Sequence, residues 1–220
     1  MSGTGPFARA CREALGAPAL AMAATFLAFG TAAAAAGLSL GWTLLAALGV
    51  YGMPGQMILL GGGGVAAAVA ANARFLPMAV SLSPWLGRGG GRWLSLPFIA
   101  VTPWAMAMRR LPHTPPTDRL RWFLGFALTS WIVAGLSALA GFLLAGRLPG
   151  PVLAVLLLTN PIYFGLIVAD AARVHPARLS VACGLLATPL ALVLPASLGL
   201  LAAGLVGGSV AFALSARRRD

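Results

Sequence analysis

No charged side chain interrupts residues 14–73, which read ALGAPALAMAATFLAFGTAAAAAGLSLGWTLLAALGVYGMPGQMILLGGGGVAAAVAANA. A bilayer core about 30 Å thick takes about 20 apolar residues per helical crossing, so this run is long enough for more than one membrane helix. Its middle, Gly52–Gln56, reads GMPGQ. Non-helical backbone at membrane depth is tolerated only inside protein or beside a water-filled cavity. A membrane helix broken in this way is typical of a transport pathway.

The composition of the whole chain indicates a membrane protein with several crossings. Of its 220 residues, 60% are hydrophobic and 9% are charged, whereas soluble domains have about 25% charged residues. The net charge of +11 comes from arginines clustered between apolar runs, which is the pattern of topology signals and not of a nucleic-acid surface. The cysteines and histidines show no metal-binding spacing, and no hydrolase or phosphate-loop motif is present. Neither an enzyme nor a cofactor or metal site is therefore expected.

The apolar blocks predict an all-α, polytopic membrane protein with about 7–8 membrane segments, some of them broken or kinked. We expect a first helix over about 16–37, a second that starts near Gly41 and breaks at Met53–Gly55, and a third through Gly61–Gly64 to Ala71. Residues 75–87 are too short to span and are expected to continue the third helix past a kink. The remaining blocks predict a marginal span over 93–108, full spans over 122–146 and 148–169, and a two-helix hairpin over 179–216.

The arginine clusters predict the sidedness and the domain organisation. Residues 1–13 form an N-terminal cytoplasmic segment, 14–213 form a single transmembrane domain, and 214–220 form a basic cytoplasmic tail. The basic loop 109–121 joins possible halves 14–108 and 122–213, and Arg147 lies alone on the opposite side. One motif recurs, because Phe26–Phe29 precedes Ala36–Ser39 as Phe123–Phe126 precedes Ala134–Ser137. This recurrence indicates a two-repeat transporter, although Ala- and Leu-rich sequences also match by chance.

The residues of the GMPGQ element are the first candidate substrate ligands. Pro54 removes a backbone donor and frees carbonyls one turn earlier, Gly55 exposes backbone, and Gln56 offers both a donor and an acceptor. A half-helix N-terminus suits a carboxylate and free carbonyls suit an ammonium, so this element is predicted to bind the head of an amino acid. The alternative is an ordinary proline kink satisfied by a neighbouring helix.

Four further polar residues are predicted to line the same pathway. Asn72 and Arg74 end the uncharged run, and the Arg74 guanidinium matches the geometry of a substrate carboxylate. The alternative for Arg74 is a helix end from which the side chain reaches the interface. Asn160 and Tyr163 flank Pro161 in an apolar run, where the alternative is a kink with local hydrogen bonds. Asp170 is expected to pair with Arg173 on a helix face rather than to carry a coupling proton.

These motifs, in this order, resemble the AzlC/YgaZ-type family of branched-chain amino acid exporters. The resemblance covers residues of about 14 to 213 and is carried by Gly52–Gln56 and by Asn72–Met78. It implies amino-acid efflux and a small membrane partner of the AzlD/YgaH type. The chain departs from the family at Thr102–Trp104, where the family commonly has the acidic sequence Thr-Asp-Glu. This departure puts proton coupling, or recognition of the substrate ammonium, in doubt.

The sequence therefore predicts a multi-pass permease of the bacterial inner membrane. It is expected to export branched-chain or similar small apolar amino acids by alternating access, together with the small partner subunit. The expected contacts are the lipid bilayer, the amino acid and that subunit, with no nucleic acid, and homo-oligomerisation is left open. The alternatives are a non-transporting scaffold or assembly subunit and a permease for a different small solute.

Overall fold

The computed structural model describes residues 5–73, 75–87, 89–173, 175–194 and 196–216, and this part of the chain contains helices and no strand. The α-helices are α1 (Pro6–Ala14), α2 (Ala17–Ala35), α3 (Leu40–Leu45), α4 (Met53–Leu60), α5 (Val65–Asn72), α6 (Phe75–Leu82), α7 (Val101–Arg110), α8 (Pro116–Leu143), α9 (Gly150–Ala171), α10 (His175–Ala187), α11 (Pro189–Val193) and α12 (Ala196–Ala216). A π-helix, η1 (Ala46–Val50), follows α3, and a 3-10 helix, η3 (Gly90–Phe98), precedes α7. The all-α prediction is confirmed.

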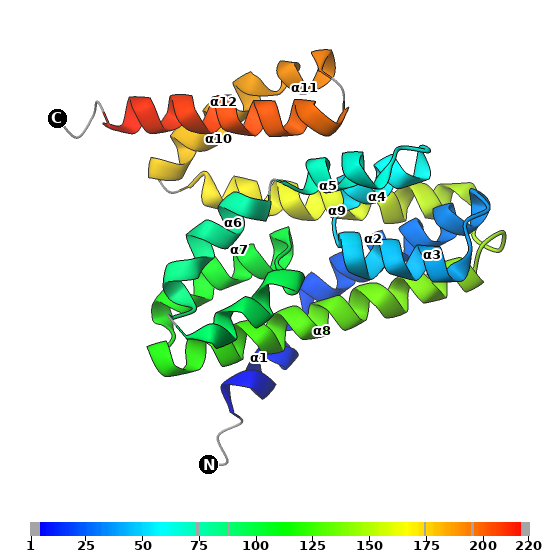
Figure 1. The fold of residues 1–220 in the computed structure, drawn as a ribbon, viewed down its shortest axis with the longest axis horizontal. Helices are drawn as coiled ribbons and strands as arrows, with labels where there is room; N and C mark the ends of the chain where they lie inside the picture. The colour runs from blue at the N-terminus through cyan, green and yellow to red at the C-terminus, as the bar shows by residue number, and fades with distance from the viewer. Residues whose placement is uncertain (1–4, 74, 88, 174, 195, 217–220) are drawn as a thin grey trace.

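The helices lie in three layers (Figure 1). The hairpin of α10 and α12 forms one outer layer, α9 lies with α4 and α5 in the middle, and α2, α3 and α8 form the other side. By length and composition, three of the described helices are able to cross a bilayer, namely α2, α8 and residues Gly150–Asp170 of α9. The helices α5 and α6, bent by 42°, form a fourth crossing if they are taken as one span.

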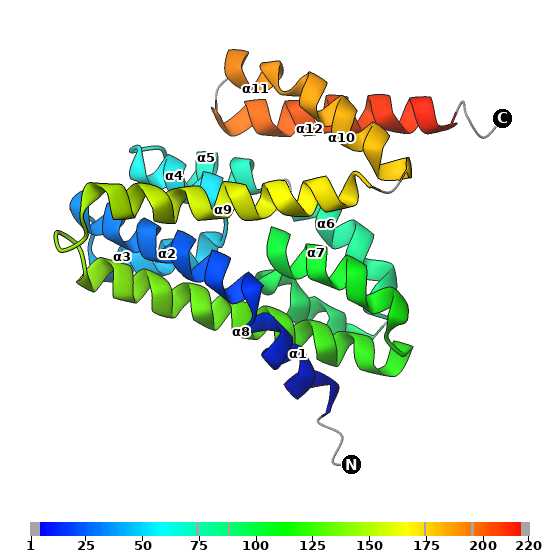
Figure 2. The same ribbon diagram turned by 180° about the vertical axis from the view of Figure 1, so that it is seen from behind.

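The centre of the fold is the contact between α2 and α8, which run in the same direction and cross closely, as Figure 2 shows from behind. A Cβ atom at Gly30 would overlap the carbonyl oxygen of Ala138, and one at Gly141 would overlap the carbonyl oxygen of Leu27. The Thr31 hydroxyl donates to the Gly141 carbonyl at 3.0 Å. Small residues are common where membrane helices approach closely, because apolar surface alone gives no driving force in lipid. The glycines therefore determine how closely these two helices pack.

The amphipathic helix α1 lies against the beginning of α8. Its alanines Ala10 and Ala14 are buried, whereas Arg9 is exposed. One oxygen of the Glu13 carboxylate accepts from Arg110 at 3.1 Å and the other accepts from the Trp122 indole at 3.1 Å. A single carboxylate therefore connects α1 with the end of α7 and with α8.

Glu13→Gln is expected to lower the free energy of unfolding by only about 0.5–1 kcal/mol, because the Arg110 partner is half-exposed and solvent weakens the ion pair. The amide still accepts from Trp122. Thermal unfolding in detergent measures the effect. The difference from the unmodified protein should shrink in about 1 M NaCl, where salt screens exposed charges. A difference that is unchanged by salt would contradict an electrostatic role for Glu13.

The predicted partner of Asp170 is wrong. Its carboxylate pairs with Arg109 of α7 at 3.1 Å, whereas Arg173 follows the end of α9 and donates its backbone N–H to the Asp170 carbonyl at 3.1 Å. Because α9 ends at Ala171, Asp170 and Arg173 do not share a helix face. The Arg109 pair holds the α7–α8 and α9–α10 connections at the same end of the molecule, where α12 also ends (Figure 1). Arg147 lies in the α8–α9 connection at the opposite end.

Some predicted helices are confirmed and others are wrong. The helices α2, α8 and α9 match the expected spans, the α5–α6 bend is the expected kink, and α10 and α12 form the expected hairpin. The continuous helix over 93–108 is wrong, because η3 ends at Phe98 and α7 begins only at Val101. The prediction of a helix through Gly61–Gly64 is also wrong. These glycines make the turn between α4 and α5, with Gly62 at φ +78°, a left-handed conformation that favours glycine.

Candidate functional site

The first element of the site is the helix break at Tyr51 and Gly52. Tyr51 has φ 44° and ψ 33°, the left-handed region, and Gly52 is extended before α4 begins at Met53. The break therefore lies just before the predicted position, because Pro54 is tolerated in the first turn of a helix, where no donor is lost. A bulky residue in the left-handed region costs about 1–3 kcal/mol and persists only when its surroundings enforce it. Such residues cluster at functional sites.

Three side chains from different helices hold this break by binding its carbonyl groups. The Gln56 amide nitrogen donates to the carbonyls of Ala46 at 3.3 Å and Ala47 at 3.4 Å. The Trp131 indole donates to the Leu48 carbonyl at 3.0 Å. Asn72 of α5 donates to the Val50 carbonyl. Carbonyls at a helix end have no intrahelical partner, so these donors stabilise the break in an apolar environment.

Glycines allow α5 to approach the break closely. A Cβ atom at Gly52 would lie 2.7 Å from the Asn72 side-chain oxygen, and one at Gly55 would lie 2.9 Å from the Ala68 carbonyl oxygen. Neither separation is compatible with a larger residue in an unchanged backbone. The glycines of GMPGQ are therefore needed for the contact between α4 and α5.

A second break lies between η3 and α7. Ile99 and Ala100 are extended, and α7 begins at Val101 without a side-chain cap. The N–H groups of Val101 and Thr102 belong to the first turn of α7 and have no intrahelical acceptor. The first intrahelical bond at this end runs from the Trp104 N–H to the Ala100 carbonyl at 3.0 Å. This half-helix therefore presents N–H donors without an intrahelical acceptor and the positive end of its dipole.

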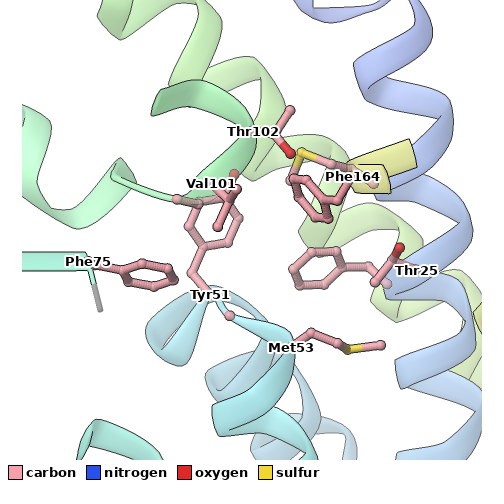
Figure 3. A pocket seen from close by; sticks show the side chains of 11 residues that line it. Thr25, Tyr51, Met53, Phe75, Val101, Thr102 and Phe164 are labelled. Carbon is pink, nitrogen blue, oxygen red and sulfur yellow. The ribbon is translucent and has the colours of Figure 1, made fainter. Parts of the chain in front are cut away.

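The two breaks meet at one cavity of about 60 Å³ (Figure 3). A water molecule needs roughly 10–15 Å³ of such space, so the cavity has room for several waters or for a small polar group. Its walls come from α2, the two breaks with the first residues of α4 and α7, α6 and α9. The lining residues are Met22, Thr25, Phe26, Tyr51, Gly52, Met53, Phe75, Ala100, Val101, Thr102 and Phe164.

The Tyr51 hydroxyl is the polar group of this cavity that lacks a partner among the described residues. The Tyr51 side chain is only 4% exposed and points from the first break toward Val101 at the start of α7 (Figure 3). A buried hydroxyl without a hydrogen bond is unfavourable by about 1–3 kcal/mol. Such a group is expected to bind a ligand or an ordered water.

A larger cavity of about 460 Å³ adjoins the first one. Its walls come from η1, α5, α6 and the end of η3, and they include Val69, Asn72 and Leu76. Tyr51 and Phe75 line both cavities. These two aromatic side chains therefore stand between the two spaces.

The structure distributes the sequence-predicted ligands around the break. Gln56 is 0% exposed and Asn72 lines the larger cavity, and both bind backbone carbonyls. Pro54 and Gly55 lie in the first turn of α4. Tyr163 is half-buried on α9, with its ring edge-on to Phe164 at 5.6 Å. Arg74 lies outside the described residues, as does the side chain of Asn160. Substrate binding by these seven residues stays a prediction.

Apart from Gly52 and Met53 of the GMPGQ element, sequence reasoning missed the residues that line the smaller cavity as candidate ligands. Tyr51 directly precedes GMPGQ, and an aromatic residue beside a glycine-rich break was a usable signal. Thr102 precedes Pro103, a pair typical of a helix start. Thr25 and Phe164 lie within ordinary apolar helices, so no local signal distinguishes them.

Discontinuous helices that meet at a cavity in an apolar helical bundle define a class of membrane transport proteins. The family described as AzlC protein matches residues 18–148, and the chain belongs to this family. It is accordingly a permease-like membrane protein. The match includes both breaks and ends before α9. No curated protein and no solved structure matches the chain.

Proposed function

We propose that this chain is a permease that exports branched-chain or similar small apolar amino acids across the bacterial inner membrane. The observation that carries the proposal is the meeting of two helix breaks, Tyr51–Gly52 and Ile99–Ala100, at one cavity. Unwound segments near the middle of a bundle are the usual substrate sites of secondary transporters. The apolar part of the lining, including Met22, Phe26 and Phe164, suits an aliphatic side chain.

The proposal includes about 7–8 membrane segments, made of the long helices, the bent α5–α6 pair and the shorter apolar helices. The shorter helices are Leu40–Val50, Ala177–Val193 and Leu201–Ala216. A two-repeat architecture is part of the proposal. It is supported by the recurring motif of α2 and α8, which run in the same direction, as equivalent helices do in parallel repeats.

Alternating access is proposed to move Tyr51 and Phe75, which stand between the two cavities. Their displacement would join the two spaces into one pathway. A small AzlD/YgaH-type subunit is proposed to complete the transporter in the membrane. The family membership supports this partner, and a second copy of the chain is left open.

Ala100→Phe is expected to reduce leucine and valine flux in proteoliposomes at least about tenfold, because the new ring would occupy the small cavity. Ala100 is 8% exposed and lines that cavity. Overpacking a buried position destabilises by about 1–3 kcal/mol, so thermal unfolding is measured alongside the flux. The control is Ala154→Phe, at an exposed position of α9 outside the lining.

The flux is measured with and without the co-purified small subunit. Equal flux in Ala100→Phe and in the control would contradict a pathway through this cavity. Absence of leucine and valine flux in the unmodified protein, with the subunit present, would favour a scaffold role or a different solute.

A further inference from the structure

We propose that the Tyr51 hydroxyl and the first turn of α7 form a carboxylate subsite, and that recognition requires no ammonium group on the substrate. The chain would then transport small apolar monocarboxylates as a class, including the 2-oxo acids that correspond to branched-chain amino acids. This inference rests on the proposed function, because it takes the small cavity as the substrate site.

The donors of this subsite come from the two breaks. The N–H groups of Val101 and Thr102 lack intrahelical acceptors, and the dipole of the ten-residue helix α7 favours an anion at this end. The second observation is independent of the helix end. The buried Tyr51 hydroxyl has no partner among the described residues and points toward Val101 (Figure 3). Donors from both breaks therefore border the same cavity.

The residues that line the cavity offer few acceptors for a cation. The side-chain oxygens of Gln56 and Asn72 are buried without a partner among the described residues, but neither residue lines this cavity. The carbonyls of Ala46, Ala47, Leu48 and Val50 at the first break already accept hydrogen bonds from Gln56, Trp131 and Asn72. The Thr25 hydroxyl donates to the Ala21 carbonyl at 2.8 Å within its own helix. The cavity therefore offers hydrogen-bond donors, hydroxyl groups and apolar surface.

No acidic side chain lines this cavity in the described part of the chain. Glu13 pairs with Arg110 and Asp170 pairs with Arg109 near the ends of the bundle, and Asp118 lies in the first turn of α8. Asp220 lies outside the described residues. An ammonium in the cavity would have no ion-pair partner there, and a desolvated charge without a partner is unfavourable. The charge pattern thus favours binding of the carboxylate end of a substrate, and recognition does not require the amine.

Competition against labelled leucine flux in proteoliposomes tests the inference. The competitors are unlabelled leucine, its 2-oxo acid, and isoamylamine, which keeps the amine and the side chain but lacks the carboxylate. We expect the 2-oxo acid to compete about as well as leucine, within about threefold, and isoamylamine to be weaker by about tenfold or more.

Tyr51→Phe removes only the hydroxyl. It is expected to lower the affinity for leucine and for its 2-oxo acid by about tenfold or more, because hydrogen bonds to a charged group are strong. The matched control is Thr129→Val on α8. It removes a hydroxyl that donates to the Gly125 carbonyl of its own helix at 2.8 Å, outside the cavity. The same ligands are also tested for thermal stabilisation of the purified protein, which reports binding without transport.

The two readouts separate the inference from the proposed function. The carboxylate subsite would be overturned if isoamylamine inhibited leucine flux as strongly as the 2-oxo acid does, or if Tyr51→Phe left that flux unchanged. Either result would leave the proposed permease function intact. A third result is thermal stabilisation by the carboxylate ligands that Tyr51→Phe abolishes, together with no flux. This result would support the subsite and contradict the permease function. Absence of both flux and stabilisation would overturn both.

Discussion

Gly141→Val is expected to prevent the chain from reaching its native fold. The Gly141 Cα lies so close to α2 that even a Cβ atom would overlap the Leu27 carbonyl oxygen. That oxygen belongs to a helix backbone and cannot rotate aside as a flexible side chain would. The Gly141 carbonyl also accepts from Thr31, so separating the helices would break this bond as well. Overpacking costs about 1–3 kcal/mol where side chains are able to adjust, and more is expected here.

The measurement is the yield of monodisperse protein in detergent, followed by thermal unfolding of whatever folds. The matched control is Gly165→Val on α9, where a Cβ atom meets nothing within 4 Å. Both variants replace a helical glycine by the β-branched residue valine, so the change in helix propensity is the same in both. A Gly141→Val protein as stable as Gly165→Val would show that α2 and α8 do not pack as closely as described.

Gln56→Leu is expected to abolish leucine flux and to lower the thermal stability. The leucine side chain is similar in size but has no donor, so the Ala46 and Ala47 carbonyls lose the bonds that Gln56 gives them. Leaving a buried acceptor unpaired is unfavourable by about 1–3 kcal/mol. Because these carbonyls belong to the π-helix that leads into Tyr51, the left-handed conformation at the break should relax.

Flux in proteoliposomes and thermal unfolding are measured on the same preparation. The control is Met57→Leu, an exposed neighbour on α4 that makes a comparable change in shape. A Gln56→Leu protein with unchanged thermal stability but no flux would instead support direct contact between Gln56 and the substrate. Full activity in this variant would contradict both roles.

Local sequence patterns were sufficient to predict the long helices. The hydrophobic stretches of α2, α8 and α9 are long enough to cross the apolar core of a bilayer, and this property depends only on consecutive residues. The same reasoning failed for 93–108, where the hydropathy suits a span but the backbone is extended at Ile99 and Ala100. Average hydropathy does not report where a helix is interrupted, particularly near prolines such as Pro97.

The candidate site was predictable only in part. GMPGQ indicated a break because glycine, proline and glutamine conflict with a continuous apolar helix. The sequence alone could not show that Gln56 and Asn72 would use their donors on nearby carbonyls. Their polar side chains predicted hydrogen bonding, and the tertiary structure shows that the bonds are made to backbone carbonyls.

The class of protein, the long helices, the position of the first break to within a few residues and the family were all predictable from the amino-acid sequence. These features follow from composition and short-range pattern. The three-dimensional contacts were needed to show that Ala100, Tyr51 and Phe164 line one cavity and that Asp170 pairs with Arg109. Such contacts join residues far apart in the chain, and they depend on how closely glycines such as Gly30 and Gly141 let the helices approach.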